Sequence, residues 1–120
     1  MATMTKRTLS GSDDGRGIKV TTASPIDGSD TTIHTAVSGT VDTDLVTLYA
    51  YCDDAAAVAL HLAWGGTTLP DDSIIQTIPS KSGLVLVTVA LPLRDSQVIV
   101  ASAATVNKIV IFGHVDRITV

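Results

Sequence analysis

The 120-residue sequence is poor in several residue types, and each shortage excludes a way of folding. Its single cysteine, Cys52, cannot form a disulfide within the chain, so a hydrophobic core must hold the fold together. Glutamate is absent, and all twelve acidic residues are aspartates. Because threonine, valine and isoleucine are abundant, the composition favours strands and turns over helices.

Other shortages exclude classes of function. The chain has only four aromatic residues, too few for a platform on which bases or sugars stack. Its net charge of −4 does not supply the basic face that nucleic-acid binding requires. No apolar run approaches the roughly 18 residues of a membrane span, and no signal peptide is recognisable. We therefore expect a soluble protein, made in a cytoplasm, that binds neither nucleic acid nor membrane.

Residues 1–16 differ in composition from the rest of the chain. They consist largely of Thr, Ser, Gly, Asp and basic residues, a mixture too polar to form a core. This predicts an extended N-terminal arm over residues 1–16, attached to a single domain over residues 17–120. We expect the arm to bind a neighbouring subunit through Lys6, Arg7, Leu9 and Arg16.

The remainder alternates between short apolar segments and turn signals. A turn every 8 to 12 residues is typical of an all-β sandwich or jelly roll, here with about eight short antiparallel strands. Period-2 alternation predicts inward rows at 46–52, 58–64 and 109–115 and a weaker row at 33–37. The expected strands are 17–22, 30–37, 43–52, 56–64, 73–79, 83–91, 97–104 and 107–118.

Two segments in the C-terminal third are apolar on both faces. In "SGLVLVTVALPL" (82–93) and "KIVIFGHV" (108–115), neither alternating set is polar, although a strand with one wet face should alternate. No helix is expected that could cover the second face, and exposed apolar patches mark association sites. We therefore expect a homo-oligomer, a trimer, with a subunit interface formed by Leu84, Val85, Val87, Val89, Leu91, Val110, Phe112 and His114.

The candidate chemical residues do not form a recognisable site. We expect no catalytic or metal-binding role for Cys52 or for His34, His61 and His114, because their spacing matches no metal or nucleophile motif. Turn formation explains the paired aspartates at 13–14, 53–54 and 71–72, and also "DGSD" at 27–30, which lacks the full spacing of a calcium loop. We therefore expect neither an enzyme nor a bound cofactor.

Four segments of the sequence resemble a known class of protein. The segments "TTIHTAVSGTVDTDLVTLYAYCDD", "LHLAWGGTTLPDD", "TIPSKSGLVLV" and "NKIVIFGHVDRIT" are similar to small virion structural proteins of tailed bacteriophages, of the head decoration (cement) type. The resemblance covers roughly residues 20–119. It implies β-rich trimers at threefold or quasi-threefold positions of the capsid, often with a terminal arm that clamps neighbouring subunits.

These observations lead to one expected function and one alternative. The protein is expected on the outer surface of a phage head, where it binds across neighbouring major capsid subunits and stabilises the head. The alternative is a receptor- or glycan-binding β-module of a tail or fibre, which would expose Trp64 beside a surface groove. The period-2 pattern instead places Trp64 on the same face as Leu60 and Leu62, closing the core.

Overall fold

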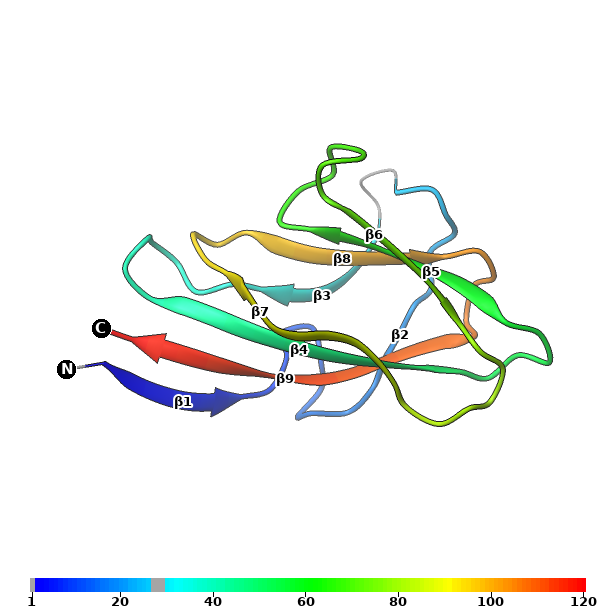
Figure 1. The fold of residues 1–120 in the computed structure, drawn as a ribbon, viewed down its shortest axis with the longest axis horizontal. Coiled ribbons are helices and arrows are strands. Elements are labelled where there is room, and N and C mark those ends of the chain that lie inside the picture. Colours follow the sequence, from blue (N-terminus) through cyan, green and yellow to red (C-terminus); the bar gives the residue numbers. More distant parts are fainter. Residues whose placement is uncertain (1, 27–29) are drawn as a thin grey trace.

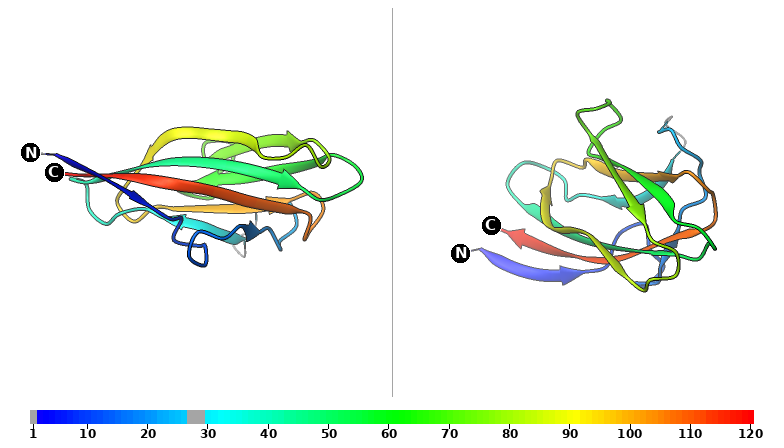
Figure 2. Two further views of the ribbon diagram at one scale, coloured as in Figure 1. Left: turned by 90° about the horizontal axis from the view of Figure 1, so that it is seen from below. Right: turned by 45° about the vertical axis from the view of Figure 1, so that its right-hand side comes forward.

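The computed structural model describes residues 2–26 and 30–120, and these residues form strands, turns and loops without a helix (Figure 1). The expected all-β sandwich is confirmed: two antiparallel sheets stack as layers, as the edge-on view in Figure 2 shows. The strands are β1 (Thr3–Arg7), β2 (Ile18–Lys19), β3 (Thr31–Thr35), β4 (Thr43–Cys52), β5 (Val58–Trp64), β6 (Ser73–Ile78), β7 (Val85–Leu93), β8 (Val98–Ala103) and β9 (Ile109–Thr119).

The strand order interleaves distant parts of the chain. One sheet, called sheet A below, has the order β1-β9-β4-β7, and β2 also pairs with β9. The other, sheet B, has the order β3-β8-β5-β6. From β2 onward, only β5 and β6 follow one another within a sheet, whereas every other connection crosses between the sheets. Apart from β5–β6, the strand pairs therefore join residues far apart in sequence.

The core lies between the sheets and contains the rows that alternation predicts. The inward residues of β4, β5 and β9 are almost completely buried, and Trp64 packs against them at the end of β5. The expected row at 33–37 is wrong at Thr35, which is exposed. A bulge in β3 between Thr32 and His34 shifts the register, so that Ile33 and His34 are both buried and the simple alternation ends there.

The N-terminal segment does not form the separate arm that its composition predicts. Residues 3–7 are β1 and pair with β9 in a regular antiparallel register, and Leu9 is 2% exposed within the core. The total accessible surface of 6089 Å² equals the ~6,100 Å² expected for a compact chain of this mass. The prediction fails because the partner of the segment is β9, more than 100 residues away, which local composition cannot reveal.

Candidate functional site

The outer face of sheet A is the most distinctive surface of the molecule. Its centre is a row across three strands: Leu86 of β7 lies opposite Tyr49 of β4, which lies opposite Phe112 of β9. Tyr49 and Phe112 each follow a buried inward residue, so their side chains face outward and are half-buried. Leu86 is 46% exposed. This row therefore presents an apolar, aromatic strip to the surroundings.

A second row extends the strip toward one end of the sheet. Tyr51 lies opposite Val110, so the outer face carries three of the four aromatic residues of the chain. The Tyr51 hydroxyl donates to Asp53 at 3.2 Å. Burial and the Asp53 carboxylate raise the pKa of Tyr51 above its usual 10, which keeps the phenol neutral at pH 7. These residues therefore add surface to the strip without adding charge at its centre.

The ring of Phe112 depends on a glycine beside it. Gly17 precedes β2, and a Cβ at this position would lie 2.7 Å from Cζ of Phe112 and 2.5 Å from Cγ1 of Val110. The missing side chain therefore leaves room for both outward residues of β9. Gly17 therefore contributes to the apolar surface by allowing this close approach.

Charged and polar groups lie toward the two ends of the apolar centre. Lys6 of β1 lies 3.6 Å from Asp116 of β9 at one end, and His114 is 4.0 Å from the same carboxylate. Lys19, exposed on β2, lies opposite Val110 toward the other end. An apolar centre with a polar rim is the usual anatomy of a protein–protein interface. We define the outer-face patch as Tyr49, Tyr51, Leu84, Leu86, Val110 and Phe112.

The structure divides the expected interface residues between the two sides of sheet A. Val85 and Val87 pack against the core, whereas Leu84 and Val89 are 56% and 64% exposed. Leu91 is half-buried opposite Val46. Val110, Phe112 and His114 are half-buried on the outer side of β9. Val85 and Val87 therefore do not lie on the exposed side with Val89, as simple alternation along residues 85–89 would predict.

Two bulges in β7 cause this division. Between the pairs Val46–Leu91 and Leu48–Thr88, and again before Tyr49–Leu86, β7 has one more residue than β4. Thr88 sits between the two irregularities, where its hydroxyl donates to the Val46 carbonyl and accepts from the Leu48 amide, both at 3.2 Å. Each extra residue reverses the alternation, so a period-2 pattern cannot predict the faces of this strand.

The residues expected to bind from an arm have separate positions. Lys6 and Arg7 lie on β1 with exposed side chains, and Arg16 is exposed near Asp13, at 4.0 Å. Leu9, by contrast, belongs to the core. The structure therefore does not bring these four residues together on one binding surface.

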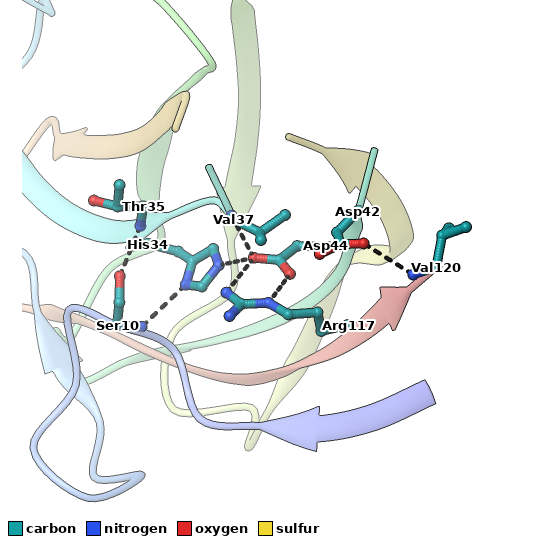
Figure 3. Close-up of polar contacts among 8 residues, drawn as sticks. All are labelled: Ser10, His34, Thr35, Val37, Asp42, Asp44, Arg117 and Val120. Carbon is teal, nitrogen blue, oxygen red and sulfur yellow. Dashed lines mark hydrogen bonds and ion pairs between the residues drawn. The ribbon is translucent and has the colours of Figure 1, made fainter. Parts of the chain in front are cut away.

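A buried polar network occupies one end of the sandwich (Figure 3). Asp44 of β4 is fully buried and accepts from Arg117 of β9 through both oxygens, at 2.7 and 3.1 Å. It also accepts from Nε2 of His34 at 2.8 Å and from the Val37 amide at 3.1 Å. The Ser10 amide donates to Nδ1 of His34 at 3.0 Å, so the ring proton lies on Nε2.

This network fixes the ionisation of its carboxylate. Burial raises the pKa of Asp44, but the hydrogen bond and charge of Arg117, together with the bonds from His34 and Val37, outweigh burial and hold the pKa below its ordinary 3.8. The same bond to Asp44 raises the pKa of Arg117. Asp44 is therefore charged at neutral pH and fully satisfied by its donors.

Ser10, His34 and Asp44 together do not form a catalytic triad. The Ser10 hydroxyl accepts from the Thr35 amide at 2.7 Å, whereas it is the Ser10 main-chain amide that reaches the imidazole. Both ring nitrogens are occupied, and His34 is 2% exposed, so no substrate can approach it. The network joins β3, β4, β9 and the N-terminal segment, which is a structural role.

The other chemical candidates remain separate. His61 of β5 is buried and bonds to the Ser73 hydroxyl at 2.9 Å, opposite the buried Ser102 of β8. Cys52 is buried, and its thiol lies 3.6 Å from the Ala56 carbonyl. Within residues 2–26 and 30–120, no three His, Cys, Asp or Glu side chains gather where a metal ion could bind. The "DGSD" segment lies largely outside the described residues.

Two further features are weak as binding sites. The indole of Trp64 is half-buried against the core and lies 3.5 Å from the Pro92 carbonyl. A shallow, open depression of about 380 Å³ lies nearby, and its lining residues include Thr43, Pro92, Leu93 and Arg94. Arg94 is the only charged group among these four, and it already donates to the Thr40 carbonyl at 2.6 Å. Neither feature offers the converging polar groups of a ligand site.

Sequence reasoning missed Tyr49 and Tyr51 as members of the outer-face patch. Both alternate with the buried row of β4, so period 2 already places them on its opposite face. Two tyrosines on the outward side of a central strand are the signal that could have identified the patch before the structure was known.

Comparisons with known proteins do not assign the chain. No protein-family model, curated protein or solved structure matches it. None of the described segments is a helix capable of crossing a membrane.

Proposed function

We propose that this chain is a structural protein of a virion, a capsid decoration protein that self-associates and binds across neighbouring major capsid subunits. The observation that carries the proposal is the outer-face patch, an apolar centre with a charged rim on a sheet that nothing in the chain's described residues covers. Oligomers with closed symmetry commonly cover such faces, and in a trimer the three patches would meet around the threefold axis.

The size of the face suits this role. Four adjacent strands, ten or eleven residues long at the centre, give a face of about 19 × 35 Å, or roughly 650 Å² in projection. A standard stable interface buries about 800 Å² on each partner. The projected area of the face is close to this value, so contacts with neighbouring copies would use most of the face, while the other sides of the molecule stay free for capsid subunits.

The fold supports the same proposal by analogy. The order β2-β9-β4-β7 over β3-β8-β5-β6, with nearly every connection crossing between the sheets, supports a sandwich of the jelly-roll type. Jelly rolls occur in viral capsid proteins as well as in lectins, so the fold allows the role without requiring it. Among the described residues, the chemical groups serve the core and the turns, which agrees with a protein that acts by binding.

The stabilising mechanism is thermodynamic. A copy that contacts two capsid subunits adds its own contact energy to theirs, and several linked contacts hold far more tightly than one. The alternative, a glycan- or receptor-binding module, is expected to expose Trp64, which instead packs against the core. The aromatic residues that do face outward, Tyr49, Tyr51 and Phe112, belong to the patch that we assign to self-association.

Self-association is tested by a charge on the patch. We expect Leu86→Lys to convert a micromolar homotrimer into monomers in analytical ultracentrifugation, because three lysines cannot be buried together without partners. The matched control is Ile75→Lys on β6, which is 65% exposed and points away from sheet A, and which should leave the oligomer unchanged. A wild-type chain that stays monomeric at every concentration contradicts self-association.

The virion assignment needs its own measurement. Mass spectrometry of purified particles from the virus that carries the gene should find the chain in multiple copies per particle. Particles that lack it should lose their genome at a lower temperature. Absence of the chain from purified particles would refute the assignment, whatever its oligomeric state.

A further inference from the structure

We propose that β1 is exchanged between copies of this protein, so that Thr3–Arg7 of one copy pairs with β9 of its neighbour. The inference rests on the self-association proposed above and adds a second contact between neighbouring copies of the oligomer. It starts from an abrupt change in burial along the N-terminal segment.

Strand β1 is held almost entirely by its main chain. All five of its residues are exposed, including the apolar Met4, which is 61% exposed. Its side-chain contact is the pair between Lys6 and Asp116, with Lys6 71% exposed, and such exposed pairs contribute little. The strand therefore buries little apolar surface that would favour its own copy of β9 over another.

The residues that follow are anchored firmly. Leu9 lies in the core, and the Ser10 amide and hydroxyl bond to His34 and to the Thr35 amide. The Gly11 amide donates to the Ile33 carbonyl at 3.0 Å, and a Cβ on Gly11 would lie 2.6 Å from that same oxygen. The weakly held β1 and the anchored residues 9–11 are joined at Thr8. β1 can therefore separate from β9 without disturbing the rest of the domain.

If β1 leaves, the edge of β9 that it occupied should keep its strand conformation. On its other side, the same stretch of β9 pairs with β4, from Thr43 opposite Ile118 to Val46 opposite Val115. An unoccupied β9 is therefore a preformed template for an added strand. The strand with the matching register and the matching Lys6 is the β1 of a second copy, which recovers every hydrogen bond and the ion pair.

The position of β1 makes exchange compatible with the outer-face patch. β1 runs along the edge of sheet A beside β9 (Figure 1), so copies that associate through sheet A bring these edges near one another. In a closed ring, each copy would give its strand to the next and receive one from the previous copy. Dissociation then requires strands to unpair as well as faces to separate, which slows the loss of a subunit.

A disulfide trap tests the exchange with the full-length chain. Thr3 and Thr119 are exposed and directly opposite, and cross-strand partners lie within the Cα separation that a disulfide spans. We mix unlabelled T3C with ¹⁵N-labelled T119C, allow air oxidation, and identify linked peptides by mass spectrometry. We expect several times more T3C–T119C heterodimer than T3C–A55C heterodimer, the control, because Ala55 lies exposed in the β4–β5 connection.

Two further measurements make the outcome decisive. The double variant T3C/T119C, closed within each chain before mixing, should give almost no labelled–unlabelled dimer, and circular dichroism should show that each variant folds. Equal yields for T119C and A55C contradict the exchange. Ultracentrifugation of the same mixtures separates the proposals: oligomers without the cross-link contradict the exchange alone, whereas monomers without it contradict self-association as well.

Discussion

At the scale of single residues, Asp44 stands out because its charged carboxylate is fully buried. Asp44 receives four hydrogen bonds from three residues, one of them the half-buried Val37. Burying a charge is costly unless it is paired and hydrogen-bonded, and here both conditions hold. The hydrogen bonds of Asp44 therefore help to specify how β3, β4 and β9 are arranged relative to one another.

We predict that Asp44→Asn lowers the free energy of unfolding by about 3 kcal/mol at pH 7, since it leaves Arg117 without its charged partner. The folded-state pKa of Asp44 is depressed, so its contribution is complete above the ordinary pKa of 3.8 and is lost as pH falls through the lower folded value. Urea unfolding of both proteins from pH 7 to pH 2 should show the difference shrinking below about pH 4. A difference that stays constant to pH 2 would contradict this account.

At the scale of elements, the N-terminal segment combines a loosely held strand with a buried anchor. Met4 on β1 and Leu9 after it are five residues apart, yet the first is 61% and the second 2% exposed. The apolar contact of the segment is therefore made after the strand ends. Local opening of β1, without loss of the core, is expected from such a distribution of burial.

We predict a large and a small loss of stability for two matched truncations in this segment. Leu9→Ala should lower the free energy of unfolding by about 2–5 kcal/mol, because it leaves a cavity in the core. Met4→Ala should change it by no more than about 0.5 kcal/mol, because the side chain is exposed. Chemical denaturation of dilute protein measures both, and similar losses for the two variants would show that β1 is part of the cooperative core.

At the scale of the whole molecule, folding and assembly should be linked. A partner that binds only the folded state stabilises it by mass action, and another copy of the chain is such a partner. The melting temperature should therefore rise with protein concentration across the range in which the oligomer forms. Scanning calorimetry at several concentrations checks this, with Leu86→Lys as the control whose melting temperature stays constant. A wild-type melting temperature independent of concentration would contradict assembly through the folded patch.

The sequence by itself determined the class of fold and the inner faces of the long strands. Alternation places Leu48, Leu60 and Ile111 inside, and the structure confirms all three, because side chains of a strand alternate whatever the strand pairs with. The aspartate-rich, glycine-containing turns likewise marked most strand ends, since turn geometry depends on a few adjacent residues.

Only the tertiary structure decided the rest. Composition predicted a free arm, but β1 pairs with a strand at the other end of the sequence. Alternation assigned the wrong faces in β7 and at Thr35, because bulges are set by pairing with neighbouring strands. The contacts of Asp44 likewise join β3, β4 and β9. Each of these features depends on hydrogen bonds between residues distant in sequence, which a local pattern of apolar and polar residues does not encode.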